Sequence, residues 1–186
     1  MLPALLLCTV ACGAVAPVSS PASAPGTVLV PGGAQEAVVV RGVDGDTVVL
    51  RGTGPGALPR GPTKVRLIGV DTPEVFASAK VRVVPQCYAE QASARTAALL
   101  PIGARVRVAP DRERKDRYGR ALLYVWTTGG LLVEEDLVRG GYGRVLVVRP
   151  NDRYAAQLRA AETAARVARR GRWGACPPAA AGRRTS

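Results

Sequence analysis

The sequence contains no histidine among its 186 residues. This absence excludes serine–histidine–aspartate triads, cysteine–histidine pairs and histidine-ligated zinc. Any side chain that accepts or donates a proton in catalysis must then be a carboxylate, lysine, tyrosine or cysteine. Aromatic residues are also scarce, at 4% of the chain, so Val, Leu, Ile and Ala must fill the core.

Acidic residues are few relative to basic ones. The chain has 14 Asp and Glu against 26 Lys and Arg, which gives a formal net charge of +12. Such a balance favours polyanionic partners, because a positive field steers them and binding releases their counterions. The alternative is a composition bias, since arginine far outnumbers lysine. Charge and motifs together indicate a nucleic acid partner.

The beginning of the sequence has no charged residue before Glu36. Residues 2–18 are mostly apolar, and residues 19–33 are rich in Pro, Gly, Ser and Ala. This composition predicts a secretory signal followed by a flexible linker, together residues 1–35, although a basic first segment is lacking. We therefore expect a secreted, extracellular protein. A membrane anchor is the alternative, but the apolar run is short for a span.

Two cleavage patterns compete within this signal. Residues 22–24, Ala-Ser-Ala, have the small-residue spacing of a signal peptidase site, whereas residues 9–12 resemble a lipoprotein site. Cleavage at the second would leave a lipidated Cys12 and a membrane-anchored lipoprotein.

The cysteines divide into two groups. Cys8 and Cys12 lie in the signal, so Cys87 and Cys176 remain as an even pair. Disulfides persist in an oxidising compartment, and we expect this pair to be bridged. The alternative is two free, buried thiols. Because the candidate site residues lie elsewhere in the sequence, we expect reduction of the bridge to change the site little.

The stretch 36–176 shows no linker-like composition and is predicted to form one domain, followed by a disordered tail at 177–186. Five segments have the composition or alternation of strands: 37–41, 47–51, 63–70, 105–108 and 121–126. Three segments are typical of helices: 88–100, 132–139 and 151–169. The pattern predicts an α+β fold with a mainly β core, in which a small barrel carries a helical cover. Periodicity alone leaves open which small barrel it is.

Two aspartates stand at predicted strand ends. Asp46 and Asp71 each occupy a position where Asp commonly stabilises a turn, and that is the simpler interpretation of either one alone. Together with the backbone carbonyl of Thr72, they make an oxygen site of the kind that Ca²⁺ prefers. The sequence therefore predicts a calcium site.

The same region supplies a base and two cations. Glu74 follows Pro73 directly, and in a chain without histidine it is the candidate general base that activates water. Arg66 and Arg120 could be solvated surface side chains. Their planar guanidinium groups also match phosphate oxygens, and two of them near a metal would stabilise a phosphorane-like transition state. This set predicts phosphodiester hydrolysis.

The motifs resemble the staphylococcal nuclease-like, or thermonuclease, family. The matching segments stand in order along the chain: VDGDTVVL (43–50), VRLIGVDTPE (65–74), DRYGR (116–120), LVRGGYGRV (137–145) and the region of Trp173. Each motif is modest alone, but all of them together are specific. The resemblance covers about residues 37–173 and implies a five-stranded OB-fold barrel with about three helices.

The resemblance also implies calcium-dependent cleavage of DNA and RNA by a monomer, on single-stranded or locally unpaired substrates. The residues that it assigns to sites are as follows: Asp46, Asp71 and Thr72 to calcium; Arg66, Glu74 and Arg120 to catalysis; Tyr118, Arg117 and Lys80 to substrate binding. Lys80 rests on a loose alignment.

One position departs from the family pattern. Val147 stands where well-known members carry a second tyrosine that packs on the nucleotide. Stacking on an aromatic ring contributes about 1–3 kcal/mol per base, so nucleotide binding is expected to be weaker unless Tyr142 substitutes. The alternative function is a catalytically silent OB-fold module that binds single-stranded nucleic acid.

Overall fold

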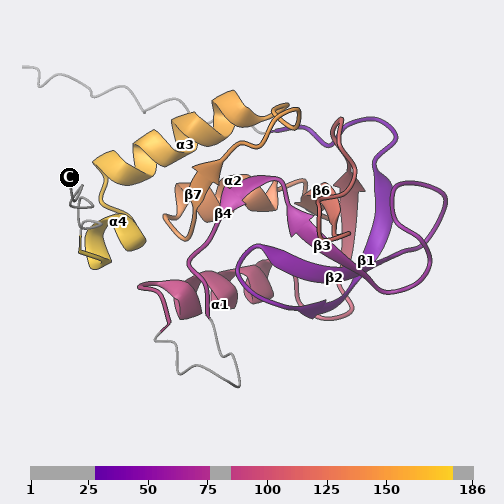
Figure 1. Ribbon diagram of the computed structural model, residues 1–186, viewed down its shortest axis with the longest axis horizontal. Helices are drawn as coiled ribbons and strands as arrows, with labels where there is room; N and C mark the ends of the chain where they lie inside the picture. The colour runs from indigo at the N-terminus through magenta and orange to yellow at the C-terminus, as the bar shows by residue number, and fades with distance from the viewer. Residues whose placement is uncertain (1–27, 76–84, 178–186) are drawn as a thin grey trace, which may run out of the picture.

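Five strands close into a barrel in the order β1-β2-β3-β6-β5 (Figure 1). The computed structural model describes residues 28–75 and 85–177. The barrel strands are β1 (Gln35–Gly42), β2 (Thr47–Gly52), β3 (Thr63–Leu67), β5 (Arg105–Ala109) and β6 (Ala121–Thr127). The predicted α+β fold with a five-stranded barrel is confirmed.

The inward faces of the strands form the main core. In β1 the buried residues alternate with more exposed ones, as expected for a strand with one face toward the core. The strands pair antiparallel except β3 and β6, which run parallel. The buried residues of this main core are aliphatic, as the scarcity of aromatic residues predicts, and include Val48, Leu50, Val65 and Leu67 from β2 and β3. A second buried cluster contains the aromatic side chains of Tyr124 and Trp126.

Helices gather to one side of the barrel, where α1 and α3 lie on either side of α2 (Figure 1). Their bounds are α1 (Ala89–Leu99), α2 (Val133–Arg139), α3 (Ala155–Val167) and the short α4 (Arg172–Ala175). The first three lie within the predicted helical segments, and α4 is additional. In α1, Ala89, Ala92 and Thr96 are buried, at the spacing of one helix face. Within the part of the chain that the structure describes, no helix combines the length and apolarity needed to cross a bilayer.

The segment 63–70, predicted as one strand, is two strands in different sheets. Gly69 has φ +84°, a conformation that favours glycine, and a Cβ there would lie 2.6 Å from Cδ1 of Leu158. The chain turns at this point, and β4 (Gly69–Asp71) pairs with β7 (Arg144–Leu146) in a separate two-stranded sheet. The register of this pair sets Asp71 opposite Arg144.

The packed part of the chain begins before β1. Val28 is buried beside Trp126, whose indole N–H donates to the Val28 carbonyl at 3.2 Å. Residues 28–35, which the sequence analysis assigned to a linker, are therefore held against the barrel. Residues 1–27, which include the predicted signal and the first part of the predicted linker, and most of the predicted tail lie outside the described residues.

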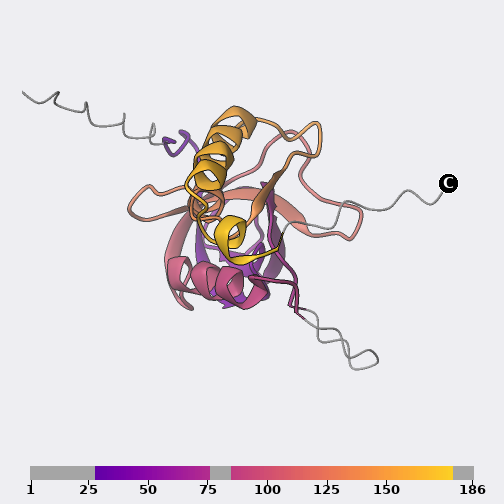
Figure 2. The same ribbon diagram turned by 90° about the vertical axis from the view of Figure 1, so that its left-hand side faces the viewer.

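A close backbone contact holds α4 in place. The Arg172 amide donates to the carbonyl of Gly141 at 3.0 Å, and a Cβ on Gly171 would lie 2.5 Å from that same oxygen. Figure 2 views the molecule from the side that carries α3 and α4, with α4 between α3 and α1. The chain after α3 therefore folds back onto the turn between α2 and β7.

The sulfur atoms of Cys87 and Cys176 lie at bonding distance, 2.05 Å apart, as a disulfide with a sequence separation of 89 residues. The bridge joins the chain just before α1 to the residue that follows α4. In a chain-entropy model, a loop of this length stabilises the fold by roughly 4–5 kcal/mol. We expect reduction to lower the free energy of unfolding by about this amount, measured by urea denaturation with and without reductant. Equal midpoints for the two forms would contradict this expectation.

Glu134 of α2 is fully buried, and its carboxyl group accepts the Val125 amide at 3.1 and 3.3 Å. Burial raises the pKa of Glu134 well above its ordinary value of 4.5, against the opposing effect of backbone hydrogen bonds. The folded state therefore holds this proton more tightly than the unfolded state. The contribution of Glu134 to the free energy of unfolding is therefore greatest below pH 4.5 and falls as the pH rises toward the pKa of the folded state.

Glu134→Gln should remove this loss of stability. Relative to the variant, the wild-type protein should lose up to about 1.4 kcal/mol of unfolding free energy per pH unit over that interval. Urea denaturation at several pH values would measure the difference. Glu135→Gln is the control, because Glu135 pairs with Arg139 on the same helix. A pH dependence that is unchanged in Glu134→Gln would refute the assignment.

Candidate active site

Arg66 of β3 joins the two aspartates that the sequence analysis singled out. Its Nη1 atom lies 3.0 Å from Oδ2 of Asp46, and its Nη2 atom lies 3.3 Å from Oδ1 of Asp71. The same guanidinium donates to the Val70 carbonyl at 2.7 Å. The side chain is only 14% exposed, so these contacts hold it in one orientation. Residues from two strands and a turn therefore meet around one cation.

Asp46 is also bonded to Thr72, which lies 26 residues further along the chain. The Thr72 amide and hydroxyl donate to Oδ2 of Asp46 at 2.9 and 3.1 Å. Gly45 permits this approach, because a Cβ there would lie 2.5 Å from Oγ1 of Thr72. The Thr96 hydroxyl of α1 donates to the Gly45 carbonyl at 2.6 Å and fixes the turn from behind. The structure thus brings the predicted calcium ligands into one neighbourhood.

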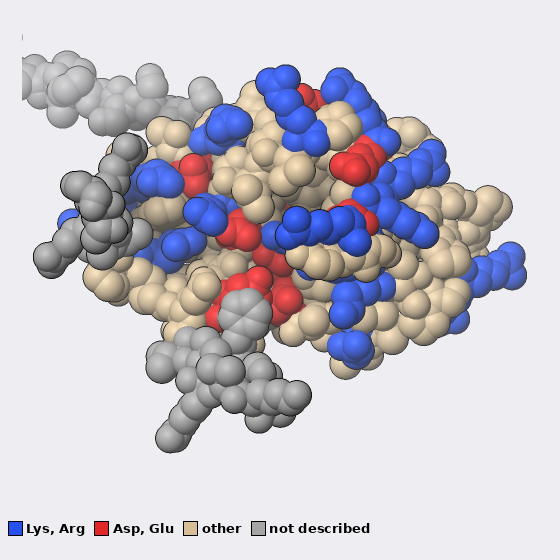
Figure 3. Space-filling model, in the orientation of Figure 1, with Lys and Arg blue, Asp and Glu red and all other residues tan. Residues whose placement is uncertain are grey.

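Negative charge accumulates here. Burial raises the pKa of Asp46 to about 6; Arg66 and the hydrogen bonds from Thr72 oppose this, and the charge of Asp44 adds to it. A divalent cation would stabilise the ionised form of such a carboxylate, so the residues present fit an oxygen-ligated metal. Figure 3 shows acidic side chains gathered near the centre of this face, with Lys and Arg side chains around them.

Glu74 lies at the edge of the same cluster. Burial raises the pKa of Glu74, and the negative charges of Asp44, Asp46 and Asp71 raise it further, while Arg66 lowers it. A carboxylate whose pKa moves toward neutrality is better matched to accepting a proton from water. The environment of Glu74 is therefore suited to a base.

Arg120 stands on the turn before β6 and is held by Asp116. Its Nε atom lies 2.6 Å from Oδ2 of Asp116, and the amides of Tyr118 and Arg120 donate to Oδ1 of Asp116, each at 2.9 Å. Burial raises the pKa of Asp116, but the hydrogen bonds and charge of Arg120 outweigh it, and the net pKa is lowered. Asp116 therefore stays ionised and orients the guanidinium.

Tyr118 lies between two cations. The guanidinium carbons of Arg117 and Arg120 lie 4.8 and 5.5 Å from the centre of its ring. Arg117 also donates to the tyrosine hydroxyl at 2.7 Å, and the side chain of Tyr118 is largely exposed. An exposed ring with cations on it offers a nucleotide both a stacking surface and positive charge.

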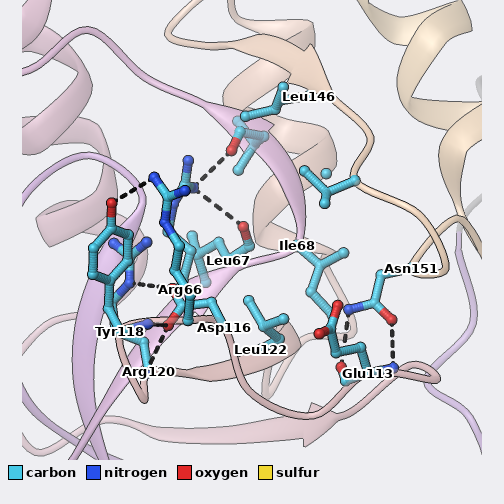
Figure 4. A pocket seen from close by; sticks show the side chains of 14 residues that line it. Arg66, Leu67, Ile68, Glu113, Asp116, Tyr118, Arg120, Leu122, Leu146 and Asn151 are labelled. Carbon is cyan, nitrogen blue, oxygen red and sulfur yellow. Dashed lines mark hydrogen bonds and ion pairs between the residues drawn. The ribbon is translucent and has the colours of Figure 1, made fainter.

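Arg66 and Arg120 line one pocket of about 490 Å³. Figure 4 shows Arg66, Tyr118 and Arg120 side by side at one end of it, and the Glu113–Asn151 pair at the other. Asn151 accepts the Glu113 amide at 2.8 Å and donates to its carbonyl at 2.9 Å. Both arginines and the tyrosine thus face a space that could receive a nucleotide, with the acidic cluster on the far side of Arg66.

The predicted calcium ligands Asp46, Asp71 and Thr72 and the predicted base Glu74 are not among the residues that line this pocket. Lys80 lies outside the described residues. Tyr142 packs against Tyr88, with ring centres 5.7 Å apart, and is not among the residues that line the pocket. Tyr142 therefore does not take the place of the nucleotide-packing tyrosine that well-known family members carry at the position of Val147. Leu146 and Val148 are the apolar side chains that this segment presents to the pocket.

Three residues that act on the site were not predicted from the sequence. Asp44 raises the pKa of both Asp46 and Glu74, and its place in an Asp-Gly-Asp turn was the available signal. Arg144 donates to Oδ2 of Asp71 at 2.8 Å. Gln86 bonds Glu74 twice: its amide donates to the Glu74 carbonyl at 3.1 Å, and its Oε1 atom accepts the Glu74 amide at 3.3 Å. No local pattern marks these last two contacts.

Comparison with known proteins identifies the family of this chain. A family model described as staphylococcal nuclease homologue matches residues 64–175, more than half of the chain. The thermonuclease of Staphylococcus hyicus is 37% identical over 109 residues, which cover 59% of this chain and 62% of that protein. The thermonuclease of Staphylococcus intermedius is 44% identical over 91 residues, covering 49% and 51%.

A Bacillus subtilis (strain 168) protein, endonuclease YncB, is 38% identical over 103 residues, covering 55% of this chain and 47% of that protein. The chain thus spans about half to three fifths of the length of these curated relatives.

Proposed function

Since this chain belongs to the staphylococcal nuclease family, we propose that it is a calcium-dependent nuclease that hydrolyses phosphodiester bonds in DNA and RNA. The observation that carries the proposal is the position of Arg66, which contacts Asp46 and Asp71 and lines the same pocket as Arg120. A silent binding module has no need of paired aspartates beside its phosphate site.

Each residue has a separate role in this reaction. Glu74 accepts a proton from the attacking water, and its raised pKa suits that task. Arg66 and Arg120 hold the oxygens of the scissile phosphate and stabilise the charge that develops on them. Asp116 keeps the guanidinium of Arg120 turned toward the pocket. Tyr118 and Arg117 contact the neighbouring nucleotide, and Lys80 contributes a further phosphate contact.

Calcium belongs to this proposal as the metal. Asp46, Asp71 and the carbonyl of Thr72 would hold it, and its charge would polarise a phosphate oxygen when bound. Magnesium demands stricter octahedral geometry, and we expect it to support little cleavage.

The substrate is proposed to be single-stranded or locally unpaired, because bases must be splayed out to lie against Tyr118. The protein is proposed to act as an exported monomer, either released or anchored through a lipid on Cys12.

One experiment separates catalysis from silent binding. Denatured DNA and RNA are incubated with the protein in the presence of calcium or of a chelator. Cleavage with calcium alone supports the nuclease; binding of either nucleic acid without cleavage under both conditions would favour the silent module.

Arg120→Lys should reduce turnover severely although it keeps the charge. The loss of one transition-state contact of this kind typically costs about 10²–10³-fold in kcat. Lysine lacks both the planar fork for phosphate and the Nε atom that Asp116 holds. The measurement is kcat on denatured DNA, with Arg112→Lys, on an exposed loop, as the matched control. Turnover in Arg120→Lys close to that of the control would remove Arg120 from the mechanism.

A further inference from the structure

Two arginines share the ring of Trp173. The guanidinium carbon of Arg166 lies 3.8 Å from the ring centre, and that of Arg172 lies 5.1 Å from it. Arg166 also pairs with Glu162 at 3.4 Å along α3. Among the described residues, the side chain of Arg172 has no hydrogen-bonded or ion-paired partner. One of the two cations is thus available to a ligand.

Arg144 connects this pair of arginines with the acidic cluster that contains Asp71. Asp71 links Arg66 on its Oδ1 side to Arg144 on its Oδ2 side, at 3.3 and 2.8 Å. Burial lowers the pKa of Arg172, and the charge of Arg144 lowers it further, while Asp71 raises it. Arg172 therefore lies within electrostatic reach of both. Arg66, which lines the pocket, is linked to Arg144 through Asp71, and Arg144 is linked to the Arg166–Arg172 pair through charge; these four residues are called the arginine row.

The arginines of this row outnumber the carboxylates that pair with them among the described residues. Among the described residues, Asp71 pairs with Arg144 and Glu162 pairs with Arg166, whereas no carboxylate pairs with Arg172. The backbone contact of Arg172 with Gly141 keeps its main chain fixed, so less freedom is lost when a ligand binds. A guanidinium on a fixed main chain, with no carboxylate hydrogen-bonded or ion-paired to it among the described residues, suits an anion with several oxygens, such as a phosphate.

We infer that Arg172, together with Arg144 and Arg166, forms a second phosphate subsite for a single-stranded nucleic acid, outside the pocket that holds the scissile phosphate. The inference rests on the proposed function, because the strand must pass Asp71 to reach α4. With this subsite, affinity depends on strand length, because a dinucleotide occupies only the pocket whereas a longer strand also reaches Arg172.

The test compares a dinucleotide with an octanucleotide, both fluorescent and single-stranded, in the Glu74→Gln background with calcium. Arg172→Ala should weaken octanucleotide binding by roughly tenfold or more, as expected for one charge-assisted contact, and leave the dinucleotide within about twofold. The slope of log affinity against log salt should fall by about 0.7 for the octanucleotide. Arg172→Gln, which keeps a side-chain stem against Trp173, should show the same loss.

Arg159→Ala is the matched control, because it removes the same charge from an exposed position on α3. Equal weakening by Arg159→Ala and Arg172→Ala, equal weakening for both ligands, or wild-type affinity in Arg172→Gln would each overturn the subsite. If the protein with Arg172 intact binds neither ligand, the proposed function and the subsite are both overturned. If affinity rises with strand length as expected but the wild-type protein never cleaves nucleic acid, only the proposed nuclease activity is overturned.

A different observation concerns Gln86 and the disulfide. Two hydrogen bonds join Gln86 to Glu74 and hold the backbone of Glu74. The next residue, Cys87, is bridged to Cys176 at the end of α4. The backbone of Glu74 is thereby tied, through one residue, to a covalent link between two helical elements.

The geometry points to Gln86 as a positioning residue for Glu74, with the Cys87–Cys176 bridge fixing Gln86. This differs from the expectation, drawn from sequence separation, that reduction would change the site little. The inference rests on the proposed role of Glu74. A base displaced by about 1 Å can cost up to 10²-fold in rate, so the effect should appear in kcat.

Gln86→Ala and Cys87→Ser/Cys176→Ser should each lower kcat by roughly 10- to 100-fold with KM within about twofold, measured well below the thermal midpoint with circular dichroism as the check on folding. Gln86→Glu keeps the acceptor oxygen and should restore kcat on the alkaline plateau of the pH profile. Gln91→Ala, an exposed change on α1, is the control.

Wild-type kcat in the folded double-serine variant, or in Gln86→Ala, would overturn the positioning role, provided that Glu74→Gln is inactive. Cleavage that survives Glu74→Gln would instead overturn the role of Glu74 in the proposed function, and the positioning role with it.

Discussion

Glu74→Gln should lower kcat on denatured DNA by about 10²–10⁴-fold, the usual contribution of a general base. The amide is nearly isosteric but accepts no proton from water. Because the backbone of Glu74, not its side chain, carries the bonds to Gln86, the variant should keep its fold and thermal midpoint. The measurement is single-turnover cleavage with calcium at saturating substrate.

Glu90→Gln provides the control, since Glu90 is an exposed glutamate in the first turn of α1. It should cleave at the wild-type rate. If Glu74→Gln also cleaved within a few-fold of wild type, Glu74 would not be the base, and the search would move to another carboxylate of the acidic cluster.

Removal of calcium should abolish cleavage and also lower stability. Asp46 is buried with other carboxylates nearby, and a bound cation offsets the repulsion among them. A ligand that binds only the folded state at 100 times its Kd stabilises that state by about 2.7 kcal/mol. Exhaustive chelation should therefore lower the thermal midpoint as well as the rate, and calcium should restore both.

Asp46→Asn separates this effect from general salt effects. The variant should show little thermal response to calcium, whereas Asp152→Asn, whose side chain pairs with Arg112, should respond like wild type. The stability readout does not depend on catalysis. Full cleavage after exhaustive chelation would rule out a metal-dependent mechanism for this protein.

Much of the barrel could be predicted because its strands have local signatures. Residues 37–41 and 47–51 are rich in valine, a β-branched residue that favours strands, and that composition is a property of neighbouring residues. The break at Gly69 escaped prediction because the residues after it pair with β7, a strand far along the sequence, in a separate sheet. The helix α4 escaped for the same reason, since its place depends on Gly141 and on the bridge.

For the candidate site, the sequence by itself determined the chemical groups. Without histidine, the candidate bases were carboxylate, lysine, tyrosine or cysteine side chains, and Asp46, Asp71 and Glu74 place three carboxylates on short segments whose spacing the sequence itself shows. Their partners were a matter of tertiary structure. Arg144 reaches Asp71 across 73 residues, because β4 and β7 pair only when the barrel and helices have packed. Hydrogen bonds and ion pairs depend on distance in space, and packing sets that distance.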